Sequence, residues 1–170
     1  MKRIVQIIAL CFILSLTWSL GFSQKCKFDF DKKDPITGES EKQISFNPSG
    51  SMSIHIRKTG AIYHLNISII FDGVKDEYLN KGDSITFKLE SGKLINVYAL
   101  DKYPPTSDVS VDQIYTYYRP VYTITEEQLK QISDSPVVFL RIVVGSVKKD
   151  FEINDKDRLK FQSIVKCILQ

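Results

Sequence analysis

The stretch SMSIHIRKTGAIYHLNISIIF, from Ser51 to Phe71, decides the fold because apolar and polar residues alternate on both sides of Thr59-Gly60. Such alternation is typical of strands with one buried face, and a glycine-containing pair between two such runs predicts a β-hairpin. With Thr59 and Gly60 as the turn, one face is apolar and the other mostly polar. The expected pairs are Ile54 with Leu65, Ile56 with Tyr63, and Met52 with Ile67 on the apolar face, and His55 with His64 on the polar face. A slip of one residue would mix the two faces, which the burial of apolar side chains resists.

Short apolar runs and glycine turns continue towards the C-terminus. A second hairpin is expected over residues 84–100. Its return run, Leu94 to Tyr98, is apolar on both faces, which is typical of a strand that sits centrally in a sheet or is covered from both sides. Residues 103–112 are rich in proline, serine and aspartate without periodicity and are expected to form a loop. Strands are also expected over residues 114–124, bent by Pro120, and over the β-branched run 137–144.

Two helices are predicted in the C-terminal third of the chain. Thr125 and Gln128 have the spacing of a capping box and start a short helix, and Asp155 is the expected cap of a final helix. The final helix carries a stripe of apolar residues at helical spacing, namely Leu159, Phe161, Ile164, Val165 and Ile168. The sequence therefore predicts an α+β fold, a mostly antiparallel sheet or sandwich of about 7–9 strands with a short helix and a C-terminal helix packed on the sheet.

The N-terminus has the pattern of a secretory signal peptide. Two basic residues precede an apolar run from Ile4 to Leu16, and small residues around Ser23 follow. This pattern predicts a signal peptide over residues 1–23 and a single β-rich domain with a C-terminal helix over residues 24–170. This apolar run is shorter than a membrane-spanning helix, which needs about 20 apolar residues. We therefore expect no stable membrane span after cleavage, and we expect the protein to be periplasmic or secreted. An uncleaved membrane anchor is the alternative.

Cysteine usage predicts one disulfide bond. Cleavage removes Cys11 and leaves Cys26 and Cys167 in a compartment where thiols oxidise. A redox pair usually has the closer Cys-x-x-Cys spacing, and a metal site needs more than two ligands. We therefore expect a structural bridge between Cys26 and Cys167.

Charge and motifs narrow the possible functions. The chain has 23 basic and 20 acidic residues, and the leader carries two of the basic ones, so the mature chain is nearly neutral and lacks a nucleic-acid footprint. It has no Gly-x-Ser-x-Gly elbow, His-Glu-x-x-His helix or phosphate-binding glycine loop. We expect a non-catalytic binding protein without a cofactor, whose partner is an unknown protein or glycan of the cell envelope. A periplasmic hydrolase with a carboxylate pair is an alternative, since such sites leave little sequence signature.

Four tyrosines are the candidate binding residues, because their rings can stack on sugar faces or anchor a partner. Alternation places Tyr115 and Tyr117 on one face of their strand and Tyr118 and Tyr122 on the other, so at least one pair is expected in the core. An exposed pair would make the protein a carbohydrate- or glycan-binding module, which is the first alternative to a protein partner.

The histidine pair is the candidate metal site. His55 and His64, expected to face each other, could bind a divalent cation, but a catalytic metal site commonly has three protein ligands. No third histidine exists, and no carboxylate can be assigned to the site from the sequence. A solvent-exposed pair without a metal is therefore the expectation.

Three segments, with the leader, carry a resemblance: residues 82–93 (GDSITFKLESGK), residues 124–129 (ITEEQL) and residues 137–142. Together they resemble small uncharacterised exported β-rich proteins of Gram-negative bacteria. The resemblance implies export and a β-rich architecture, and it implies no particular activity.

Overall fold

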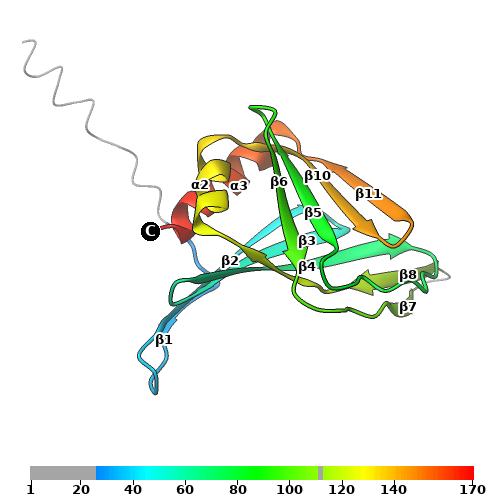
Figure 1. Ribbon diagram of the computed structural model, residues 1–170, viewed down its shortest axis with the longest axis horizontal. Coiled ribbons are helices and arrows are strands. Elements are labelled where there is room, and N and C mark those ends of the chain that lie inside the picture. The colour runs from blue at the N-terminus through cyan, green and yellow to red at the C-terminus, as the bar shows by residue number, and fades with distance from the viewer. Residues whose placement is uncertain (1–25, 111–112) are drawn as a thin grey trace, which may run out of the picture.

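The computed structural model describes residues 26–110 and 113–170, which form one antiparallel sheet of 11 strands and two helices (Figure 1). The strands are β1 (Phe30–Lys33), β2 (Ser40–Ser49), β3 (Met52–Thr59), β4 (Ile62–Asp72), β5 (Ser84–Leu89), β6 (Leu94–Ala99), β7 (Thr106–Ser110), β8 (Gln113–Tyr118), β9 (Val121–Ile124), β10 (Val137–Val144) and β11 (Val147–Glu152); the helices are α2 (Glu126–Asp134) and α3 (Asp155–Ile168). The predicted α+β class is confirmed, but the expected strand number, about 7–9, is too low. The predicted signal peptide lies outside the described residues, among which no helix is long and apolar enough to cross a membrane.

Two departures from the expected elements add strands. The expected loop over residues 103–112 contains β7, which pairs along its whole length with β8. Residues 106–109 are exposed, so this part of the strand carries no hydrophobic alternation by which sequence could reveal it. The run 114–124 forms two strands, β8 and β9, because Pro120 lacks the backbone N–H that a continuous ladder needs.

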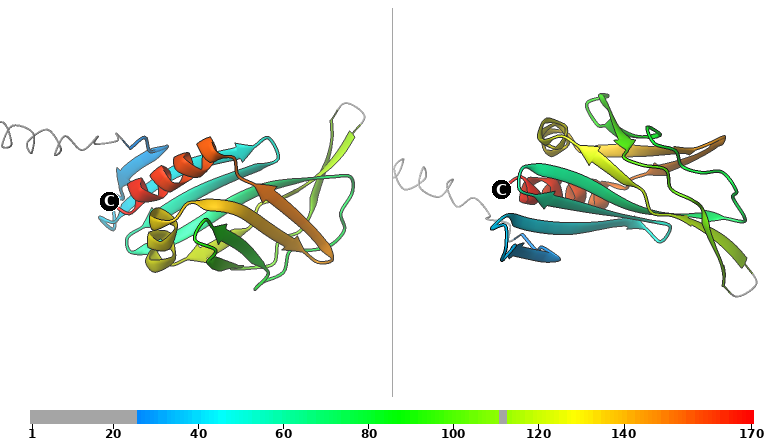
Figure 2. Two further views of the ribbon diagram at one scale, coloured as in Figure 1. Left: turned by 90° about the horizontal axis from the view of Figure 1, so that it is seen from above. Right: turned by 60° about the horizontal axis from the view of Figure 1, so that its bottom comes forward.

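The sheet branches at β4. The first half of β4 pairs with β9, which leads on through β6, β5 and β10 to β11, while its second half pairs with β8. The β7–β8 hairpin therefore projects from the end of the molecule that lies opposite the C-terminus (Figure 2). Helix α3 packs against β2 and β10, so it lies on the inner face of the bent sheet (Figure 1).

The aromatic centre of the core joins this helix to both parts of the sheet. The ring of Phe161 stacks on that of Phe46 from β2 at a centroid distance of 4.7 Å, and it lies 6.4 Å from that of Phe87 on β5. Four of the five predicted stripe residues are buried, but Leu159 is 63% exposed, since it lies on the side of α3 that faces away from the sheet. The helix cap is Asn154, whose side chain accepts from the backbone of Asp157, one residue earlier than predicted.

The capping box of α2 is confirmed. The Thr125 hydroxyl accepts from the backbone N–H of Gln128 at 3.1 Å, and the Gln128 amide oxygen accepts from the Thr125 N–H at 2.9 Å. The two bonds satisfy the backbone N–H groups of Gln128 and Thr125, so hydrogen bonds between residues close in sequence set the start of the helix.

The register of the first hairpin differs from the prediction by two residues. The turn is Gly60-Ala61, so that Ile54 pairs with Ile67 and Ile56 pairs with Leu65. Gly60 has φ +56°, which the first position of a two-residue hairpin turn requires and which a β-branched Thr59 would resist. A shift of two leaves every side chain on its predicted face, because the side-chain period of a strand is two.

Strand β6 is covered on one face only. Ile95 and Val97 are buried under the inner face, but Leu94 and Tyr98 are 58% and 56% exposed. Of the two expected placements, β6 has the central one, between β9 and β5, and it lacks cover on both sides. The physical reason is that α3 packs on the inner face of the sheet alone.

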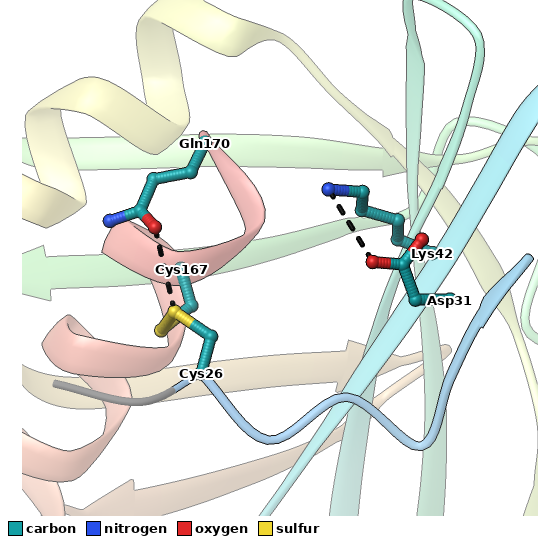
Figure 3. The surroundings of a disulfide bond; sticks show 5 residues. All are labelled: Cys26, Asp31, Lys42, Cys167 and Gln170. Atoms are coloured by element: carbon teal, nitrogen blue, oxygen red, sulfur yellow. Dashed lines mark hydrogen bonds and ion pairs between the residues drawn. A yellow bond between two sulfur atoms is a disulfide. The ribbon is translucent and has the colours of Figure 1, made fainter.

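The predicted disulfide is present. Cys26 and Cys167, separated by 141 residues, are bridged with their Cα atoms 5.5 Å apart (Figure 3). The side chain of Gln170 lies beside the bridge, with its Oε1 atom 3.7 Å from Cys26 Sγ. The bridge therefore ties the first described residue to the last turns of α3.

Candidate binding site

The four candidate tyrosines divide as alternation predicts. Tyr118 and Tyr122 are 1% and 0% exposed and belong to the core, whereas Tyr115 and Tyr117 are only partly buried on the outer face of β8. The expectation that at least one pair packs in the core is confirmed. Only the outer pair is available to a ligand.

The side chains of Tyr118 and Tyr122 belong to the packing of the core. The Tyr118 hydroxyl donates to the backbone oxygen of Glu77 at 2.7 Å, and its ring meets Phe71 edge to face at 5.5 Å. The Tyr122 hydroxyl has no hydrogen-bond partner among the described residues. Burial raises the pKa of both phenols, so neither is suited to donate or accept protons for chemistry near neutral pH.

A groove of about 450 Å³ brings Tyr117 together with Tyr103. Its other lining residues come from the approach to β7, from β7 itself and from the end of β8: Pro104, Thr106, Ser107, Asp108 and Arg119. Two aromatic side chains and several hydrogen-bonding groups thus face one hollow on the projecting hairpin. This combination is typical of a ligand site, in which apolar surface supplies contact and a few polar groups give orientation.

Backbone pairing positions the two rings. Tyr117 lies opposite Thr106 in the β7–β8 register, two positions from the Asp108–Tyr115 pair. Tyr103 is fixed by two backbone hydrogen bonds with Leu79, of 2.7 and 3.1 Å, and its hydroxyl donates to a backbone oxygen of β9 at 3.4 Å. Hydrogen-bonded backbone thus holds both tyrosines in place before a ligand binds, which limits the conformational entropy lost on binding.

The groove carries one cation and one carboxylate. Arg119 is exposed, and no ion pair or hydrogen bond of its side chain occurs within residues 26–110 and 113–170. Asp108 Oδ1 accepts from the N–H of Val109 at 2.8 Å, and Asp108 lines the groove. The described lining includes no histidine or cysteine, so the groove presents donors, acceptors and ring faces.

Sequence reasoning named Tyr117 and missed the rest of the groove's polar lining. Arg119 follows Tyr117 by two residues, and strand alternation was enough to place it on the same face. Thr106 and Asp108 lie in the segment 103–112, whose sequence lacks the periodicity of a strand and predicts a loop. No local pattern indicates that this segment returns beside Tyr117.

The candidate metal ligands do not face each other. His55 pairs with Asn66, and His64 pairs with Arg57, so the predicted opposition is wrong for the same reason as the hairpin register. The described residues contain no group of three side chains of the kinds that bind metals. His64 instead lines a separate hollow of about 620 Å³ on the outer face.

His55 belongs to a short polar chain. Its Nδ1 atom lies 2.6 Å from the hydroxyl oxygen of Ser45, and the same hydroxyl donates to the carboxylate of Asp29. In a catalytic triad the imidazole lies between the acid and the nucleophile, whereas here the serine lies between the acid and the imidazole. The arrangement therefore orients His55 and does not activate Ser45.

No family model, curated protein or solved structure matches the chain. The resemblance to exported proteins of Gram-negative bacteria stays a prediction. A fold by itself does not imply an activity, so the chemistry of the groove is the guide to function.

Proposed function

We propose that this protein is an exported, non-catalytic binding protein, and that the groove between Tyr103 and Tyr117 holds a saccharide of the cell envelope. The bridge between Cys26 and Cys167 supports work outside the reducing cytosol, where such bonds persist. It agrees with the signal-peptide pattern in the sequence.

The observation that carries the proposal is the pairing of two fixed tyrosine rings with hydroxyl, carboxylate and guanidinium groups in one groove. A saccharide offers C–H faces to the rings and hydroxyl groups to the polar lining. The volume of about 450 Å³ lies within the range of small-molecule sites, about 300–1,000 Å³. The partner is therefore a small repeating unit of a glycan, and the site performs recognition without bond cleavage.

A second candidate function, docking of a protein partner, has a different observation in its favour. Leu94 and Tyr98 are exposed on the outer face of β6, and Leu94 lines a hollow of about 740 Å³ together with Phe139 and Lys88. Exposed apolar surface of this kind is common at interfaces. Crosslinking in the native envelope, with photoreactive groups placed at Leu94 and separately at Thr106, separates the two candidates. Capture of a protein at Leu94 would favour the docking function, and capture of a glycan at Thr106 would favour the groove.

The test of the glycan proposal is retention on immobilised envelope polysaccharides. Tyr117→Ala and Tyr103→Ala should each weaken retention about two- to tenfold, since an aromatic contact contributes about 0.5–1.5 kcal/mol. Tyr98→Ala is the matched control, because Tyr98 is an exposed tyrosine outside the groove. Equal retention of all three variants would contradict the proposal, and turnover of any polysaccharide would favour the hydrolase alternative.

A further inference from the structure

We infer that the groove selects acidic saccharides, with Arg119 binding their carboxylate, sulfate or phosphate group. The inference rests on the proposed function, since it assigns the class of glycan that the same groove takes. It goes beyond that function because the aromatic rings alone would accept neutral sugars equally well.

Arg119 differs from the other arginines of the described chain. Arg57 pairs with Glu41, Arg141 pairs with Asp150 at 2.7 Å, and Arg158 pairs with Asp155 at 2.9 Å. Arg119 alone among the described arginines has no carboxylate partner, although it lines the groove. An arginine side chain presents a planar fork of donors that matches a carboxylate or phosphate in a two-point contact.

The carboxylate of Asp108 does not neutralise this cation. Asp108 lies opposite Tyr115 in the β7–β8 register. Arg119 follows Tyr115 by four residues along the chain. With a rise of about 3.4 Å per residue, the two charged positions are about 14 Å apart along the strand. The groove therefore has an anion-binding end at Arg119 and a hydroxyl-binding end at Asp108.

This polarity fits a sugar acid better than an acidic peptide. An ionised carboxylate accepts hydrogen bonds, and sugar hydroxyls supply the donors that Asp108 can bind. Thr106 lies opposite Tyr117, between the two ends, and its hydroxyl can donate or accept, whereas the Ser107 hydroxyl lies 3.2 Å from that of Thr116. A run of peptide carboxylates would place a like charge against Asp108, which is unfavourable.

The experiment measures retention of the full mature protein on three immobilised polymers at one ionic strength. They are polygalacturonate, its methyl ester, and dextran, so that the first two differ only in the carboxylate charge. We expect wild-type protein to bind polygalacturonate about tenfold more tightly than the ester. Arg119→Gln should lower the ratio to about one without changing retention on the ester or the melting temperature, and Arg119→Lys should recover part of it.

Lys88→Gln is the matched control, because it removes one positive charge from the outer face outside the groove and should leave the ratio unchanged. Equal binding of polygalacturonate and its ester, still weakened by Tyr117→Ala, would overturn this inference and leave the proposed function standing. No retention on any of the three polymers would overturn this inference, whereas the proposed function is decided separately by retention on immobilised envelope polysaccharides. Displacement of polygalacturonate by polyglutamate at equal charge concentration would also overturn the inference, in favour of an acidic peptide.

Discussion

Glu77 holds Ser146, 69 positions away, by both oxygens of its carboxylate. Oε2 accepts from the backbone N–H of Ser146 at 2.7 Å, and Oε1 accepts from its hydroxyl at 2.8 Å. The Glu77 backbone oxygen also accepts from Tyr118. The segment between β4 and β5 is thereby joined to β8 on one side and to the β10–β11 turn on the other.

We expect a side chain at position 145, where the chain has Gly145, to collide with the Glu77 carboxylate. A Cβ atom at Gly145 would lie 2.0 Å from Glu77 Oε2, and its φ of +54° disfavours any L residue. Gly60 has nearly the same φ, +56°, in a comparable turn, but a Cβ there would meet Glu39 at an ordinary 3.7 Å. In equilibrium urea unfolding, Gly60→Ala should cost about 1–2 kcal/mol from backbone strain, and Gly145→Ala should cost clearly more. Equal losses would mean that Glu77 moves aside freely.

The Glu77 contact should make stability depend on pH in a defined direction. Hydrogen bonds from the Ser146 hydroxyl, and then from its N–H, hold the pKa of the Glu77 carboxyl below its ordinary 4.5. A lowered pKa in the folded state contributes stability that is complete above pH 4.5 and is lost as the pH falls through the folded-state value. The difference in unfolding free energy between wild type and Glu77→Gln should therefore shrink below that pH. A difference that stays constant down to about pH 3, about 1.5 units lower, would contradict the contact.

Removal of the hydroxyl should lower the stability of the protein at Tyr118 but not at Tyr122. Tyr118→Phe removes a 2.7 Å bond to Glu77 and should cost about 1 kcal/mol. Tyr122→Phe removes a hydroxyl that has no partner among the described residues, so it should be neutral or stabilising. Thermal unfolding followed by circular dichroism measures both. A loss at Tyr122 as large as that at Tyr118 would reveal a partner such as a bound water.

Reduction of the disulfide should destabilise the domain substantially. The bridge closes a loop of 141 residues, for which chain entropy predicts about 4 to 5 kcal/mol, less any native strain. The Cys26→Ser, Cys167→Ser double variant should therefore unfold at lower urea concentration than the oxidised wild type, and reduced wild type should match the variant. Intact mass after alkylation of natively isolated, unreduced protein provides the check, since two modified thiols would show that the bridge is absent.

Features that depend on neighbouring residues were predicted well. The alternation around Gly60 revealed the first hairpin and its buried face, and Thr125 with Gln128 revealed the start of α2. The hairpin register was wrong by two because face alternation cannot distinguish shifts of two, and only the backbone of Gly60 decides between them. The cap at Asn154 was displaced by one residue because Asn154 and Asp155 are both good caps.

The sequence by itself determined a β-rich chain with two helices, an inner and an outer face for each tyrosine of β8, and the cysteines that pair across the chain. These follow from side-chain period, local capping and the scarcity of thiols. Only the tertiary structure decided that β7 is a strand, that Tyr103 meets Tyr117, and that Arg119 stays without a carboxylate partner. The physical reason is that these relationships arise where β4 branches and separate segments meet, and the free energy of such long-range pairing has no signature in any short window of sequence.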